Sequence, residues 1–341
     1  MKRKQNVLVI ILEWVLAVAI GGFIAFYLFR NLFDEQRPLS NADIPQTTID
    51  WFSGLWDGGS DIGGILGPDD WKPEDWSRYE DIDSMYRIED DLFVIYYSKK
   101  DSVVERNKAL ICQRYAHEAV PVGELFMKMY PYPHLLNGRK LPIYLAKTVY
   151  DFRSICKQIG HGDPGTWAIG LYCFQYGVRG VYTDGIIISS EAWKVSDRQI
   201  HEQTQDEYLK QTLWHEMNHF MYFTNWDYTQ TSKPCLWFTE GLAEYFAGSY
   251  DRLREVGNYS RLNLTEDFRG GGNTEYWAGM SAYLCLEKNH GKSTVSDVVT
   301  NSYQHSVDES LKMTIPNYSL AAWNDQWHTF MENKEYRKYM K

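Results

Sequence analysis

The distribution of hydrophobic and polar positions divides the chain into three stretches. Residues 7–29 form one long apolar run in which Glu13 is the single charged residue, VLVIILEWVLAVAIGGFIAFYLF. Residues 30–84 contain few aliphatic side chains, whereas residues 85–341 show apolar positions at the spacings of strands and helices. We therefore expect an apolar spanning segment, a connecting region and one folded domain.

The folded domain is predicted to carry its strands first and most of its helices afterwards. Short apolar segments predict a hairpin or one long bent strand at residues 86–97, a helix over 102–130, and strands at 141–146, 166–176 and 185–189. Gly177, Gly180 and the pair Asp184-Gly185 separate the last two strands, which we expect to be antiparallel neighbours. Helical periodicity then covers residues 206–224, 236–250, 274–290, 293–303 and 320–339. The expected fold class is α+β, with a sheet-bearing half followed by a helical half.

The apolar run is predicted to be a transmembrane anchor. Its 23 residues would form a helix roughly 34 Å long, enough to cross a hydrocarbon core of about 30 Å. A cleaved signal peptide would have a shorter apolar core followed by a small-residue site, and this chain continues instead with Arg30-Asn31-Leu32. Lys2, Arg3 and Lys4 precede the run, so the positive-inside rule places residues 1–6 in the cytoplasm. We expect a single-pass protein of the cell membrane with residues 30–341 on the extracytoplasmic side.

Residues 30–84 are predicted to be an acidic stalk or a partly ordered lead-in. Positions 34–84 hold 13 acidic and three basic residues, together with clustered glycine and proline. Their tryptophans could dock on the following domain or, as a weaker alternative, belong to a glycan-binding or cell-wall-binding module.

Charge and cysteine content exclude some classes of function. The chain after residue 29 has a formal net charge of −12, which argues against nucleic acid as a partner. Five cysteines lie far apart without a CxxC pair, so a cysteine metal site is not expected. We expect buried free thiols, with a disulfide as the alternative.

A metal-binding motif lies within the predicted helix at residues 206–224. His215-Glu216-Met217-Asn218-His219 is an HExxH sequence, and positions four apart on a helix share one face. Both imidazoles could therefore bind one metal ion while Glu216 lies beside it as a general base. The HExxH spacing favours metal binding over a chance arrangement.

A third ligand is expected downstream, because catalytic zinc takes three protein ligands and keeps one position open for water. The sequence PCLWFTEGLAEYFAG provides Glu240 at the start of the next predicted helix. Gly241 after it allows close helix packing. Glu244 lies one turn further on the same face, where its carboxylate could accept a hydrogen bond from the free ring nitrogen of a ligating histidine.

HEMNH followed by WFTEGLAEYF resembles the gluzincin zinc metallopeptidases, and most closely their bacterial peptidase-MA-like members. The resemblance extends over residues 141–341 in the order of its elements. It implies a zincin-like catalytic domain at residues 85–341, Zn²⁺ held by His215, His219 and Glu240, and hydrolysis of peptide or protein substrates with Glu216 as base. Gluzincins often add a Tyr or His that stabilises the oxyanion, and Tyr276 is the preferred candidate over Tyr283, with packing as the alternative for each.

The chain departs from two gluzincin subgroups. It has no GxMEN signature of the large aminopeptidases before the zinc motif. It carries Thr239-Glu240 and Glu244 where thermolysin-like enzymes have Asn-Glu and Asp. The alternative to a peptidase is a zinc-stabilised binding or regulatory ectodomain without turnover, against which the presence of Glu216 argues.

Overall fold

The computed structural model describes residues 79–128, 136, 138–162, 164, 168–177, 180–189, 205–229, 231, 233–268, 270 and 273–340. All of them belong to the second of two units into which the chain divides, Ile62–Lys341. Within this part of the chain, no helix combines the length and the apolar character that a membrane crossing requires. The expected anchor at residues 7–29 and most of the expected stalk lie outside the described residues.

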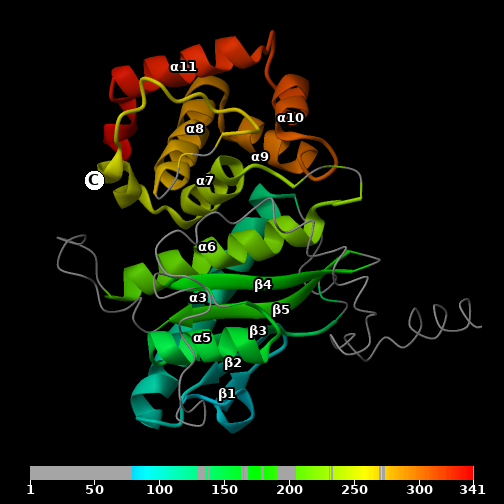
Figure 1. The fold of residues 1–341 in the computed structure, drawn as a ribbon, viewed down its shortest axis with the longest axis vertical. Coiled ribbons are helices and arrows are strands. Elements are labelled where there is room, and N and C mark those ends of the chain that lie inside the picture. The colour runs from blue at the N-terminus through cyan, green and yellow to red at the C-terminus, as the bar shows by residue number, and fades with distance from the viewer. Residues whose placement is uncertain are drawn as a thin grey trace, which may run out of the picture. The chain divides into compact units, whose positions relative to one another are not determined.

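A five-stranded mixed sheet forms the first half of the described chain (Figure 1). Its spatial order is β1 (Tyr86–Glu89), β2 (Phe93–Tyr97), β3 (Leu141–Ala146), β5 (Gly180–Ser189) and β4 (Gly170–Gly177). The β1–β2 pair is an antiparallel hairpin, β2, β3 and β5 run parallel, and β4 pairs antiparallel with β5. Among the described strands, β4 therefore forms one edge of the sheet. The antiparallel pairing expected for the last two strands is confirmed.

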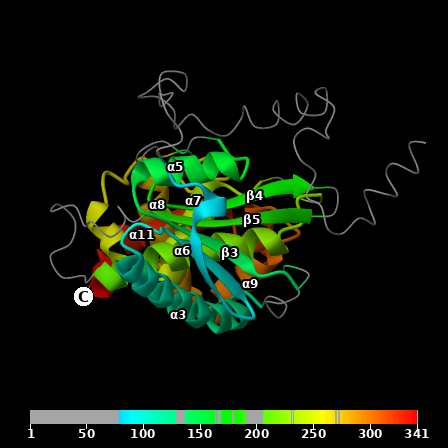
Figure 2. The ribbon, with the colours of Figure 1, turned by 90° about the horizontal axis from the view of Figure 1, so that it is seen from below.

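Helices cover both faces of the sheet (Figure 2). Helix α5 (Val149–Gln158) packs on one face, where Phe152 and Ile155 meet Ile187 of β5. Helices α3 (Ser102–Phe126) and α6 (Gln205–Asn225) cover the other face, which bears Ile186 and Ile188. The side chains of β5 alternate between the two cores, as the period of a strand requires. The mixed α+β class is thus confirmed.

The remaining helices lie on the far side of α6 from the sheet (Figure 1). They are α7 (Leu236–Ala247), α8 (Thr274–His290), α9 (Lys292–Asn301), α10 (Val307–Thr314) and α11 (Leu320–Glu332), with short 3-10 helices η4 (Tyr250–Glu255) and η5 (Glu335–Tyr339). A further 3-10 turn, η2 (Ile82–Ser84), precedes β1 and adjoins α5 through the hydrogen bond from Ile82 N to Gln158 Oε1. Helix α6, which carries the HExxH motif, lies between the sheet and the helices α7 to α11.

Most predicted elements are present, and two helices were missed. β3 and α8 have the predicted bounds, whereas α5 and α10 were not predicted. The helix expected over 320–339 is interrupted at Lys334, whose φ of 54° ends α11 before η5 begins. All five cysteines are buried free thiols, as expected.

Candidate metal centre

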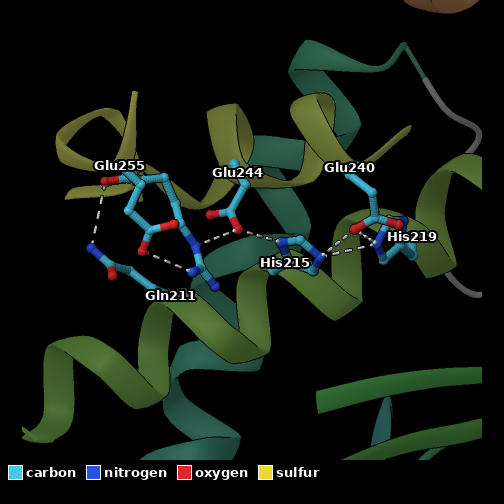
Figure 3. A network of polar contacts seen from close by, with 8 residues as sticks. Gln211, His215, His219, Glu240, Glu244 and Glu255 are labelled. Atoms are coloured by element: carbon cyan, nitrogen blue, oxygen red, sulfur yellow. Dashed lines mark hydrogen bonds and ion pairs between the residues drawn. The ribbon is translucent and has the colours of Figure 1, made fainter. Parts of the chain in front are cut away.

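The two histidines of the HExxH motif and Glu240 meet between α6 and α7 (Figure 3). His215 Nε2 lies 3.1 Å from His219 Nε2 and 3.2 Å from Glu240 Oε2. His219 Nε2 is 3.4 Å from the same carboxylate oxygen. One donor atom from each residue therefore converges on one point, and this His-His-Glu group could hold a metal ion.

The spacing of the three donor atoms fits a small tetrahedral ion. Zinc bonds of about 2.0–2.1 Å at tetrahedral angles place neighbouring donors about 3.3–3.4 Å apart. The three edges of the donor triangle are 3.1, 3.2 and 3.4 Å. Two imidazole nitrogens and one carboxylate oxygen are also a donor set that zinc accepts. The residues present therefore fit a zinc ion.

Close packing of two glycines fixes the helix that carries Glu240. A Cβ atom on Gly241 would lie 2.3 Å from the carbonyl carbon of Gly279 in α8. A Cβ atom on Gly279 would lie 1.9 Å from the carbonyl oxygen of Trp237 in α7. Only glycines allow α7 and α8 to approach this closely, so the predicted packing role of Gly241 is confirmed.

Glu216 is buried between α6 and the edge strand β4. Its side chain accepts a hydrogen bond from the backbone N–H of Tyr172, and the residue is 7% exposed. A Cβ atom on Gly170 would lie only 2.6 Å from Glu216 Oε1 and 2.9 Å from Thr212 Cγ2. The bare backbone of Gly170 therefore leaves the space that the carboxyl group occupies. Burial, the largest effect, raises the pKa of Glu216 above its usual value, while the nearby histidines act to lower it.

The neighbouring charges shift the pKa values of His215 and Glu240 in opposite directions. Burial acts to lower the pKa of His215, but the hydrogen bond to Glu240 and the charges of Glu244, Glu216 and Glu240 raise it to about 9. Burial acts to raise the pKa of Glu240, whereas the charge of His219 and the hydrogen bonds from both histidines hold it well below its usual range. Glu240 therefore stays ionised, as a carboxylate ligand must.

Glu244 lies behind His215, on the side away from Glu240. Its Oε1 atom is 3.6 Å from His215 Nδ1, the ring nitrogen that does not face the donor cluster. Arg252 of η4 donates from Nε to the same oxygen at 3.1 Å and from Nη1 to Glu255 at 3.4 Å. Glu244 is thus held in place by an arginine that the sequence offered no signal to find, since Arg252 lies outside every motif. The Nδ1 atom of His219, in contrast, is buried and has no hydrogen-bond partner within the described structure.

Of the two candidate tyrosines, Tyr276 contacts one of the three donor residues, His215. Its ring is nearly parallel to that of His215, with centroids 6.0 Å apart, and the guanidinium of Arg252 lies 5.5 Å from its centroid. The charge of Glu240, followed by burial, raises the pKa of the Tyr276 hydroxyl, which therefore keeps its proton. Tyr283 is 2% exposed and donates to the carbonyl oxygen of Phe238 at 3.1 Å, so it has a packing role.

No protein-family model and no curated protein matches this chain.

Proposed function

We propose that this protein is a zinc metallopeptidase of the gluzincin type, with a zincin-like catalytic domain at residues 85–341. The observation that carries the proposal is the triangle of donor atoms from His215, His219 and Glu240 with the carboxyl group of Glu216 buried beside it. Glu216 contributes no atom to the donor cluster. A site that only bound a structural metal would therefore not require this carboxylate.

The bound zinc would lower the pKa of a water ligand and polarise the carbonyl group of the scissile peptide bond. Glu216 would accept a proton from the attacking water and transfer it to the departing amine. The backbone N–H of Tyr172 holds the Glu216 carboxyl group in place for both transfers. Tyr276, which stays protonated beside Glu240, would donate a hydrogen bond to the oxyanion that develops on the substrate.

Strand β4 suits an extended peptide substrate. It ends the sheet among the described strands, and its residue Tyr172 contacts Glu216 through the backbone. A peptide that adds to this edge through main-chain hydrogen bonds would bring its own backbone to Glu216. The site therefore favours peptide or protein substrates over small molecules without an extended backbone.

The apolar run at residues 7–29 would anchor this domain to the membrane, with residues 1–6 in the cytoplasm. Protease added to intact cells should then degrade the large domain. A domain that survives until the cells are lysed would contradict the proposed orientation.

Replacement of Glu216 by Gln tests the catalytic proposal. Gln keeps the shape of the side chain and an oxygen for the Tyr172 N–H, but an amide cannot accept the proton. We expect Glu216→Gln to retain one zinc per chain and a melting temperature at least that of the wild type. Hydrolysis of a mixed peptide library should fall by about 10²- to 10⁴-fold, the usual cost of removing a general base.

Glu287 of α8 provides a matched control, because it accepts a hydrogen bond from the Tyr245 hydroxyl of α7 and contributes no atom to the donor cluster. Glu287→Gln should leave both zinc content and hydrolysis unchanged. Equal hydrolysis by wild type and Glu216→Gln would refute the role of Glu216. A folded, zinc-loaded wild type that cleaves nothing would favour the non-catalytic binding domain instead.

A further inference from the structure

Aromatic side chains continue from the candidate metal centre along α6 and β4. We call them the aromatic strip: Phe174, Tyr176, Phe223, Trp226 and Tyr228. Phe223 lies one turn beyond the ligand His219, with ring centroids 6.1 Å apart. The ring of Phe174 stacks on Phe223 at 5.0 Å. The strip therefore begins in direct contact with a proposed metal ligand.

Ring contacts also join the residues at the far end of the aromatic strip. Tyr176 meets Trp226 at 6.2 Å and Tyr228 at 5.4 Å between ring centroids. Phe223 and Trp226, 7% and 5% exposed, form its base. Phe174, Tyr176 and Tyr228 are only partly buried. The strip therefore combines a buried base with partly buried rings next to the candidate metal centre.

The strand that carries Phe174 also sets where a bound peptide would lie. Gly170, Tyr172 and Phe174 face α6, because they lie against Thr212, Phe220 and Phe223 in turn. Tyr176 lies on the same side of β4 and meets Trp226, the residue that directly follows α6. A peptide paired with the edge of β4 would place every second side chain on this same face. Phe174 is two residues beyond Tyr172, so it lies about 7 Å further along the strand from the point where Glu216 is held.

Antiparallel pairing, the more stable arrangement for adjacent strands, determines which part of the substrate meets the strip. β4 runs from Gly170 near Glu216 towards Tyr176. An antiparallel peptide runs in the opposite direction, so its residues on the N-terminal side of the scissile bond would lie beside Phe174 and Tyr176.

We propose that the aromatic strip is a specificity site that binds one aromatic side chain of the substrate, within about two residues of the scissile bond on its N-terminal side. This inference rests on the proposed peptidase function and names the substrate feature that the same site selects. Burial of apolar area against the strip, together with stacked and edge-to-face pairing of the rings, favours such a side chain over a small one such as Ala.

The test compares peptides that differ at one position. Cleavage of a peptide library by the full-length wild type locates the scissile bonds, and matched peptides with Phe or Ala at each of the two N-terminal positions then give the ratio of kcat/KM for Phe over Ala. We expect a preference for Phe of about 10-fold or more at one of these positions. Phe174→Ala should reduce that ratio by at least about 5-fold, with unchanged zinc content.

Tyr96 provides the matched control. It is half-buried and stacks on Tyr144 at 4.9 Å, much as Phe174 stacks on Phe223, but it packs with the core on the α5 face of the sheet. Tyr96→Ala should leave the Phe-to-Ala ratio unchanged. If Phe174→Ala fails to fold, Phe174→Leu keeps most of the volume and should still lower the ratio.

The outcomes separate the two proposals. A wild type that cleaves no peptide refutes the proposed function. Three results would overturn the specificity site and leave the proposed function intact. The wild type cleaves peptides but shows no preference for Phe, it prefers Phe only on the C-terminal side of the scissile bond, or Phe174→Ala leaves the Phe-to-Ala ratio unchanged.

Discussion

Substitution of Gly170 by Ala tests whether Glu216 is positioned by the edge strand. The added methyl group would lie 2.6 Å from Glu216 Oε1 and 2.9 Å from Glu216 Cγ. Ordinary contacts of this kind begin near 3.4 Å, so the carboxyl group would have to move by about 0.8 Å. A displacement close to 1 Å at a reacting group can cost about 10²-fold in rate. We therefore expect Gly170→Ala to lower kcat for peptide hydrolysis by about 10- to 100-fold.

The metal donors should not respond to this change, because the contacts of the new methyl group involve Glu216 and Thr212 rather than the donor atoms. The assay measures peptide hydrolysis and zinc content together. Gly162 is the matched control, since a Cβ atom there would meet nothing within 4 Å. Gly162→Ala should behave as wild type. Full activity in Gly170→Ala would refute the placement of Glu216 against β4, and loss of zinc would show that the strand supports the donors instead.

Three further predictions concern the surroundings of the site and the pH dependence of stability. Glu244→Ala should weaken zinc retention by about 10- to 100-fold in a chelator competition, because His215 loses the carboxylate behind its ring. If the variant loses zinc as completely as Glu240→Ala does, Glu244 is itself a ligand. Tyr276→Phe should lower kcat by about 10- to 10²-fold with unchanged zinc content if its hydroxyl stabilises the oxyanion, and an unchanged kcat would leave Tyr276 a packing role. Burial, with a further contribution from Asp151, raises the pKa of Glu80 in the fold despite a hydrogen bond from Ser98. The stability contributed by protonated Glu80 is therefore present below its unfolded pKa and is lost as the pH rises through the folded pKa. Glu80→Gln should raise the melting temperature at pH 8 and leave it close to wild type near pH 4; a lower melting temperature at pH 8 would contradict this reasoning.

Local signals set the ends of several helices, and the sequence prediction used only some of them. α8 ends at His290 because Gly291 follows with a φ of 90°. α7 was expected to continue to residue 250, but Gly248 adopts the left-handed conformation and ends it at Ala247. α10 was missed although Ser306 and Glu309 form a capping box, a signal that the sequence does contain.

The grouping of His215, His219 and Glu240 could be predicted from the sequence because it depends on the spacing within two successive helices. Spacing on one helix brings His215 and His219 together, and Glu240 lies in the second turn of the next helix, which begins at Leu236. The contacts of Gly170 and Arg252 could not be predicted, since they depend on how β4 and η4 pack against α6 and α7. Tertiary packing rather than spacing decides which neighbours hold Glu216 and Glu244 in place.

X-ray absorption at the zinc edge tests the central claim most directly. The purified protein, loaded with one equivalent of zinc, should show two imidazole nitrogens and carboxylate or water oxygens at about 2.0–2.2 Å and no sulfur. Replacement of His219 by Ala should remove the bound zinc. A sulfur shell near 2.3 Å, or failure of the folded protein to bind one zinc ion, would contradict a metal centre formed by His215, His219 and Glu240.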